Sequence, residues 1–149
     1  MTSPAASAKP LASYPALKGR RVLVAEDNPV NQTIARRMLE KAGITATLVS
    51  DGHQVLERCE RQRFDLILMD VQMPGLDGLE ATRQLRARGD STPIVALTAN
   101  ATIESHKTCL EAGMSDFISK PFRYQQLQRV LHRYLGAVND DPDADGTRP

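Results

Sequence analysis

Five side chains that could act together in catalysis or metal binding lie at the ends of four short apolar runs. They are Glu26 and Asp27 after residues 22–25, Asp70 after 66–69, Thr98 at the end of 94–98, and Lys120 after 117–119. One acid after an apolar run is usually the solvated end of a strand. Matching positions on four runs favour a shared site instead.

The types of these side chains indicate a particular chemistry. Two like charges about 4 Å apart repel by roughly 4 kcal/mol at an effective dielectric near 20, so three clustered carboxylates need a divalent cation or a raised pKa. Oxygen ligands with free positions suit Mg²⁺. Lys120 offers a point charge and Thr98 a hydroxyl for phosphoryl oxygens, and Asp70 could itself accept a phosphoryl group as an aspartyl phosphate.

Helical patterns separate the apolar runs. The first helix is predicted to begin at Asn28-Pro29, an N-cap residue followed by proline, and to end at Gly43. Its apolar residues recur every four positions, as Val30, Ile34, Met38 and Ala42. A second strand is predicted at 45–49.

Three further helices and a final amphipathic helix complete the pattern. Asp51 and Asp77 are each predicted to cap a helix, and another helix spans about 102–112 before Gly113. Asp77 could be mistaken for a second catalytic acid, but capping is the favoured interpretation. The last helix is indicated by the spacing of Leu127, Val130, Leu131, Tyr134 and Leu135.

Five strands alternating with five helices predict an α/β fold. Such alternation implies parallel strands with right-handed crossovers, and runs that are apolar throughout imply strands buried on both faces. We therefore expect a doubly wound (βα)₅ sheet of the flavodoxin-like type, in strand order 2-1-3-4-5, with helices on both faces. Functional groups gather at the carboxyl ends of the strands in such sheets.

Four segments of the chain closely resemble the receiver domain of two-component response regulators. They are AEDNPVNQ (25–32), LILMDVQMPGLDG (66–78), PIVALTAN (93–100) and ISKPF (118–122). The resemblance covers about 21–136. It implies that Asp70 is the phosphoacceptor, that Asp27 and Asp70 bind Mg²⁺ directly, with Mn²⁺ as a possible substitute, and that Glu26 and the backbone carbonyl of Gln72 complete the site.

The resemblance also assigns roles around the lysine. Thr98 and Lys120 are expected to hold the phosphoryl oxygens, and the Lys120–Pro121 bond is expected to be cis. Phe117 occupies a position where many family members carry tyrosine. Two readings stay open for Phe117: a conformational switch that acts with Thr98, or ordinary core packing.

The expected function is that of a signalling phosphoacceptor, not an enzyme with an external substrate. A histidine kinase or histidine phosphotransfer protein would donate the phosphoryl group, which is later lost by self-catalysed hydrolysis. The helix at 102–112, the strand at 117–119 and the last helix would form an output surface for a protein partner. EDNPVNQ and ALTANA resemble receivers attached to hybrid histidine kinases.

Composition limits the other possibilities. The chain has 149 residues and a net charge of +1, which gives no sign of nucleic-acid or membrane contact, and no apolar run has the length of a membrane span. Residues 1–20 read as a disordered linker or tail, 21–136 as the domain and 137–149 as a disordered acidic tail. Two cysteines without a metal-binding spacing fit the cytoplasm, even if a parent protein is membrane-anchored.

Three alternative functions share parts of this pattern. A flavodoxin-like FMN domain needs a phosphate-binding loop after the first strand, where Glu26 and Asp27 would repel phosphate. A phosphatase of the haloacid dehalogenase type would carry a second acid two residues after its nucleophile, where this chain has Gln72. An inert receiver-like interaction module would not need the complete set of reactive side chains.

Overall fold

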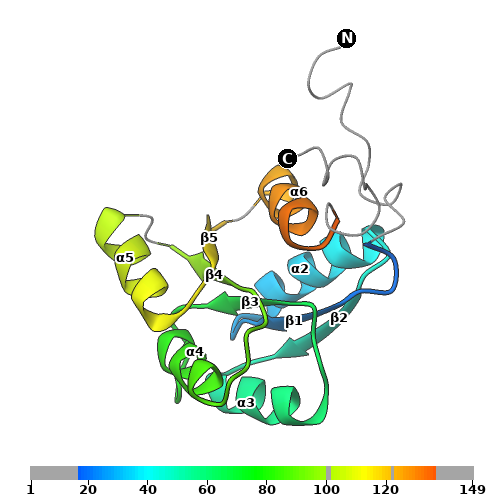
Figure 1. Cartoon of the computed structure of the whole chain (residues 1–149). Helices are drawn as coiled ribbons and strands as arrows, with labels where there is room; N and C mark the ends of the chain where they lie inside the picture. The colour runs from blue at the N-terminus through cyan, green and yellow to red at the C-terminus, as the bar shows by residue number, and fades with distance from the viewer. Residues whose placement is uncertain (1–16, 100–101, 122, 137–149) are drawn as a thin grey trace, which may run out of the picture.

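The computed structural model describes residues 17–99, 102–121 and 123–136. Strands and helices alternate as the sequence predicts (Figure 1). The elements are β1 (Arg21–Ala25), α2 (Pro29–Lys41), β2 (Thr45–Val49), α3 (Gly52–Arg61), β3 (Leu66–Asp70), α4 (Gly78–Ala87), β4 (Ile94–Thr98), α5 (Ile103–Ala112), β5 (Asp116–Ser119), α6 (Tyr124–Leu131) and a π-helical turn, η3 (His132–Gly136).

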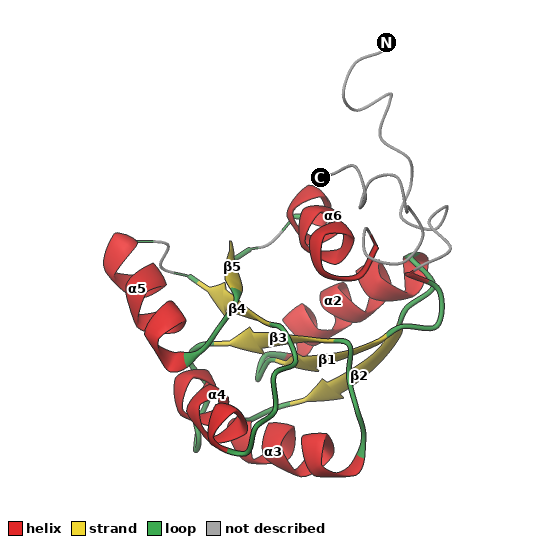
Figure 2. Ribbon diagram, viewed as in Figure 1, coloured by secondary structure: helices red, strands yellow, loops and turns green. Residues whose placement is uncertain are grey.

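The five strands form one parallel sheet in the order β2-β1-β3-β4-β5, which confirms the predicted fold. Helices α2 and α6 cover one face, and α3, α4 and α5 cover the other (Figure 2). Alternate residues of β1, β3 and β4 therefore enter two separate apolar clusters, one on each face. All residues of β3 and β4 are buried, as expected for central strands of such a sheet.

Short polar side chains begin most of the helices. Asn28 caps α2 by accepting hydrogen bonds from the backbone of Val30 and Asn31, and Asp51 caps α3. Asp77 accepts from the Glu80 amide at 2.9 Å at the start of α4, which confirms it as a cap. These caps satisfy backbone amides that have no partner within the helix.

The buried face of helix α2 does not follow the row of apolar residues that are spaced four apart in the sequence, from Val30 to Ala42. Ala35 and Leu39 are buried, whereas Val30 is 66% and Ile34 is 40% exposed. A step of four residues overshoots the turn of about 3.6 residues, so a row with this spacing drifts around the helix. The beginning of the row therefore faces away from the core.

The ordered domain begins before residue 21. Leu17 is fully buried in the cluster beneath α2 and α6, the Gly19 amide donates to the Gly43 carbonyl, and Arg20 donates to the Leu135 carbonyl. The expectation that residues 1–20 form a linker is therefore wrong for 17–20. The segments 1–16 and 137–149, expected to be disordered, lie outside the described residues.

The C-terminal helix changes its winding near the end. Leu127, Val130, Leu131 and Leu135 are buried as the spacing predicts, but α6 stops at Leu131 and continues as the π-helical turn η3. Across the described part of the chain, none of the helices has the length and apolar character needed to cross a membrane.

Candidate functional site

The strands deliver the predicted reactive side chains to one cavity. Glu26 and Asp27 follow β1, Asp70 ends β3, Thr98 ends β4, and Lys120 follows β5. All five line a cavity of about 560 Å³ at the carboxyl edge of the sheet. Parallel strands bring these groups together because their carboxyl ends meet at the same edge.

Three carboxylates form the acidic part of the cavity. One oxygen from each of Glu26, Asp27 and Asp70 lies within 4.8 Å of the other two. Glu26 and Asp70 are only 1% and 4% exposed, whereas Asp27 is open to solvent. Two desolvated acids beside a solvated one form a strongly negative site that a small cation can still reach.

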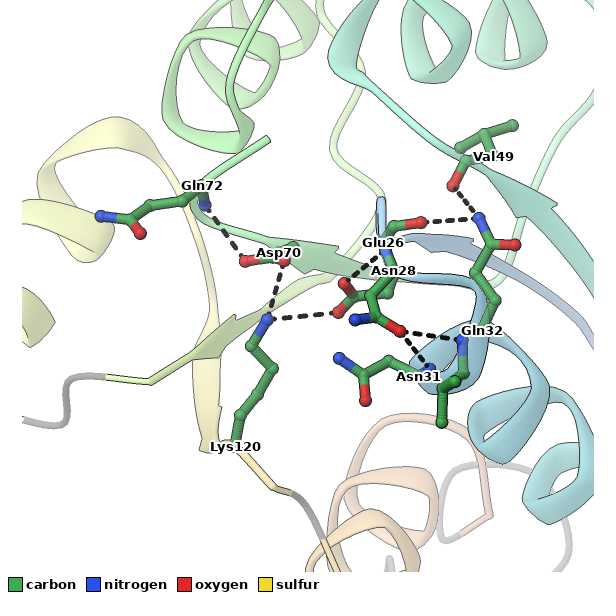
Figure 3. A network of polar contacts seen from close by, with 9 residues as sticks. Glu26, Asn28, Asn31, Gln32, Val49, Asp70, Gln72 and Lys120 are labelled. Atoms are coloured by element: carbon green, nitrogen blue, oxygen red, sulfur yellow. Dashed lines mark hydrogen bonds and ion pairs between the residues drawn. The ribbon is translucent and has the colours of Figure 1, made fainter. Parts of the chain in front are cut away.

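Lys120 connects the two buried acids. Its Nζ lies 2.8 Å from Asp70 Oδ2 and 3.3 Å from Glu26 Oε1 (Figure 3). Burial on its own would lower the pKa of Lys120, but its hydrogen bond to Asp70 and the charges of Asp70 and Glu26 outweigh burial and raise that pKa. The ammonium is therefore held in its charged form beside the carboxylates.

The surroundings of Glu26 favour the neutral form of its carboxyl group. Burial raises the pKa of its carboxyl group above the ordinary value, and the nearby charge of Asp70 adds to this effect. The hydrogen bond from the Asn28 amide to Oε2, 3.0 Å long, and the charge of Lys120 oppose the rise without cancelling it. The ionised site is thus short of positive charge.

The loop after β3 is fixed closely against Asp70. The backbone N–H of Gln72 donates to Asp70 Oδ1 at 3.1 Å, and the backbone N–H of Gly78 donates to the Val71 carbonyl. A Cβ atom on Gly78 would clash with the Asp70 carbonyl oxygen, so glycine allows α4 to start directly behind the strand end. On the other side of the site, the Lys120–Pro121 bond is cis, as expected.

The donor set fits a hard divalent cation. It consists of carboxylate oxygens that converge from two strands, with one of them exposed to solvent. Mg²⁺ prefers oxygen ligands, keeps several waters and takes few protein carboxylates. The residues present therefore suit such an ion. The described residues provide no other group of three or more His, Cys, Asp or Glu side chains in comparable proximity.

Phe117 does not line this cavity in the described structure. It is half-buried at the edge of the cluster beneath α3–α5, and its ring contacts that of His106 in α5 at a tilt of 35°, with 3.4 Å between ring centroids. The structure thus gathers the predicted site residues around the cavity, except Phe117, which packs against α5 instead.

Sequence reasoning missed the contribution of Gln32. Its side-chain amide donates to the Glu26 carbonyl, at the point where the chain leaves β1 for the acidic pair. It also missed three hydroxyl-bearing residues that line the cavity: Thr102, which caps α5, and Ser105 and Thr108 within that helix. Gln32 lies within the AEDNPVNQ segment, but nothing in its residue type predicts which carbonyl it contacts.

Comparison with known proteins gives the family. The model of the response regulator receiver domain matches residues 22–132. The sensor protein GacS of Pseudomonas syringae pv. syringae is 39% identical over 127 residues, which is 82% of this chain and 14% of that protein. Hybrid signal transduction histidine kinase K of Dictyostelium discoideum is 44% identical over 120 residues, 74% of this chain and 10% of that protein.

Solved structures agree with this match. The receiver domain of the sensor histidine kinase PA1611 from Pseudomonas aeruginosa, with a magnesium ion coordinated in its active-site cleft, is 51% identical. The alignment covers 79% of this chain and 98% of that one, with a TM-score of 0.73. The receiver domain of Ssk1 from Saccharomyces cerevisiae, crystallised with the histidine phosphotransfer protein Ypd1, is 29% identical over 80% of this chain and 90% of that one, with a TM-score of 0.76.

The chain spans only a small part of the length of the curated relatives named above. Within that part, the family match, the strand order and the acidic cavity agree. This chain belongs to the response regulator receiver family, the phosphoacceptor domains of two-component and phosphorelay signalling.

Proposed function

We propose that Asp70 is the residue that accepts the phosphoryl group. The observation that carries this proposal is the position of its carboxylate, which is buried, held by Lys120 at 2.8 Å, and open to a cavity shared with Glu26 and Asp27. Asp70 Oδ would form a bond to phosphorus while the bond from phosphorus to the donor's histidine nitrogen breaks. The electron pair of that bond stays on the imidazole, which takes up a proton.

Glu26, Asp27, Asp70 and the backbone carbonyl of Gln72 would hold Mg²⁺ at this site. When bound, the ion supplies positive charge that offsets the negative charge of the carboxylates and of the incoming phosphoryl group. The acidic cluster and the magnesium-bound relative support this assignment. Mn²⁺, which also accepts oxygen ligands, is proposed as a substitute.

Lys120 and Thr98 would position the phosphoryl oxygens. The Lys120 ammonium is already beside the Asp70 oxygen, and Thr98 ends the neighbouring strand on the cavity wall. Both groups would stabilise the charge of the transferring phosphoryl group, which is the main requirement of this chemistry. Later loss of the phosphoryl group to water would be catalysed by the same site, without an external substrate.

The proposed donor is a phosphohistidine on a histidine kinase or a histidine phosphotransfer protein. The complex of the related Ssk1 receiver with Ypd1 supports the second class, and the hybrid histidine kinase relative supports a place in such a parent protein. A cytoplasmic location belongs to this proposal and is supported by two free cysteines.

Helix α5, strand β5 and helix α6 would form the surface that responds to phosphorylation. Ile103 and Leu110 on α5 are exposed apolar side chains, and Phe117 on β5 lies between α5 and the sheet. Phosphorylation would shift an existing equilibrium towards a state in which Phe117 is rotated towards Thr98, and this would change the surface.

Intact-protein mass spectrometry tests the acceptor. With a small acyl phosphate and Mg²⁺, the wild-type protein should gain one phosphoryl group, and Asp70→Asn should gain none because it lacks the nucleophilic oxygen. Asp77→Asn is the matched control: it alters an acid nearby that serves as a helix cap, and it should label like wild type. Equal labelling of wild type and Asp70→Asn would refute the assignment.

A further inference from the structure

The side-chain amide of Gln32 lies within hydrogen-bond distance of three acceptors at the carboxyl edge of the sheet, and Figure 3 shows two of them, the carbonyls of Glu26 and Val49. Its Nε2 lies 2.6 Å from the Glu26 carbonyl oxygen, 3.2 Å from the Val49 carbonyl oxygen and 3.3 Å from Ser50 Oγ. Gln32 is in the first turn of α2, which Asn28 and Pro29 begin. The side chain therefore ties the end of β1 to the end of β2.

The contact with Glu26 lies where the regular strand pairing stops. Strand β1 ends at Ala25, and the Glu26 amide still donates to Val49 at 3.0 Å. The Glu26 carbonyl accepts its hydrogen bond from Gln32. Since a peptide unit is planar, holding this carbonyl also fixes the plane that joins Glu26 to Asp27.

Asp27 depends on that backbone plane more than its two acidic neighbours do. The Glu26 side chain is held by the Asn28 amide and by Lys120, and Asp70 is held by Lys120 and the Gln72 amide. Asp27 is exposed, and no hydrogen bond or ion pair joins its carboxylate to another described residue. Its place in the acidic group is therefore set by the backbone at Glu26–Asp27.

We propose that Gln32 is a positioning residue for the divalent cation, and through it for phosphoryl transfer to Asp70. This inference rests on the function proposed above. Gln32 is not placed to touch the ion or the phosphoryl group; it acts by fixing the peptide plane from which the Asp27 side chain starts. Residues that orient metal ligands in this way commonly change metal affinity by about 10–100-fold when they are replaced.

Two substitutions separate the hydrogen bonds from the space that the side chain fills. Gln32→Met keeps the length of the side chain and removes the donor. Gln32→Glu keeps its shape but presents a carboxylate oxygen to the Glu26 and Val49 carbonyls. Gln54→Met is the matched control, because Gln54 accepts from the Ser50 amide in the same loop and makes no hydrogen bond to Glu26 in the described structure.

The measurement is the Kd for Mg²⁺, by calorimetric titration of the full chain well below its unfolding temperature. Both Gln32 variants should raise this Kd by roughly tenfold or more, whereas Gln54→Met should leave it unchanged. Labelling of the Gln32 variants by an acyl phosphate should be slow at low Mg²⁺ and return to the wild-type rate at saturating Mg²⁺.

A merely structural role predicts a different result. Gln32 variants that unfold at a lower temperature but keep the wild-type Kd would overturn the proposal, as would variants that match wild type in both respects. If Gln32→Met does not fold, the Kd of Gln32→Glu decides. If the wild-type protein itself takes up no phosphoryl group, the proposed function fails, whereas normal labelling of wild type with an unchanged Kd in the variants rejects only the role of Gln32.

Discussion

Asp70 and Asp116 are two nearly buried carboxylates on the same sheet, at 5% and 10% side-chain exposure, but their surroundings differ. Asp70 ends β3 and shares one lysine with Glu26, beside a third acid. Asp116 begins β5 and therefore lies at the amino-terminal end of its strand, whereas Asp70 lies at the carboxyl-terminal end of β3. Its Oδ2 lies 3.2 Å from Arg133, 3.6 Å from Arg129 and 3.3 Å from the Tyr134 hydroxyl.

If Asp70 is the acceptor, as proposed above, the comparison indicates that burial and ion pairing do not by themselves make an acid reactive. Around Asp70, three carboxylates gather beside one ammonium group, which pairs with only Asp70 and Glu26, so the site is short of positive charge. Around Asp116, two guanidinium groups and a phenol surround one carboxylate, so its charge is already offset. The local balance of charge, together with an open cavity, distinguishes a reaction site from a structural anchor.

The largest expected difference is in the rate of phosphoryl uptake. Lys120→Met removes the cation beside the proposed acceptor oxygen of Asp70 and should slow labelling by an acyl phosphate about 100-fold. Arg133→Met removes a cation from Asp116 and should leave the rate unchanged. A time course of labelling, followed by intact mass at saturating Mg²⁺, measures both rates. Similar rates for the two variants would remove the distinction between the two acids.

The next difference is the direction in which neutralising one acid of each region changes the free energy of unfolding. Folding raises the pKa of the Glu26 carboxyl group. The contribution of this group to stability is therefore complete below its pKa in the unfolded chain, and it is lost as the pH rises through its pKa in the folded chain. At neutral pH without Mg²⁺, Glu26→Gln should therefore raise the unfolding free energy. Asp116→Asn should lower it by about 1 kcal/mol, because a donor would replace an acceptor.

Chemical denaturation in the presence of a chelator measures both free energies. Addition of Mg²⁺ should reduce or reverse the advantage of Glu26→Gln, since the ion stabilises the native carboxylate. It should not alter the effect of Asp116→Asn. A loss of stability in Glu26→Gln without metal would contradict the view that the site is short of positive charge.

The smallest difference concerns alkaline pH. Burial raises the pKa of Tyr134, and the charge of Asp116 adds to the rise. The stabilising effect of this phenol is therefore complete below its ordinary value near pH 10 and is lost as pH rises through the folded value. The stability advantage of wild type over Tyr134→Phe should shrink in this range. Tyr124→Phe is the control, because that ring packs under the Lys41 ammonium instead.

Local signals were enough to predict most of the fold. Apolar runs located the central strands, and Asn28, Asp51 and Asp77 marked helix starts through short-range hydrogen bonds that depend on neighbouring residues alone. The strand ends then placed Asp70 and Lys120 at one edge. The gathering of these residues follows from parallel topology, which the alternating pattern already implies.

Features that depend on contacts distant in sequence were not predicted. Leu17 is buried because of residues that follow it much later, including Leu135. Asp116 finds its partners in α6 and η3, and Gln32 reaches the end of β2 as well as that of β1. In each case the residue type allows the interaction, but only the assembled sheet brings the partner within reach.

The contact between Arg20 and Leu135 has a consequence for chain connectivity. It places the first and the last described residues of the domain at one corner, because Leu17 and Leu135 share the same apolar cluster. That corner lies by the amino end of β1, whereas the acidic cavity opens at the carboxyl ends of the strands. A circular permutant that joins these two ends and opens the chain in another surface loop should therefore keep the proposed phosphoryl-transfer chemistry. For the same reason, the domain suits insertion between other domains.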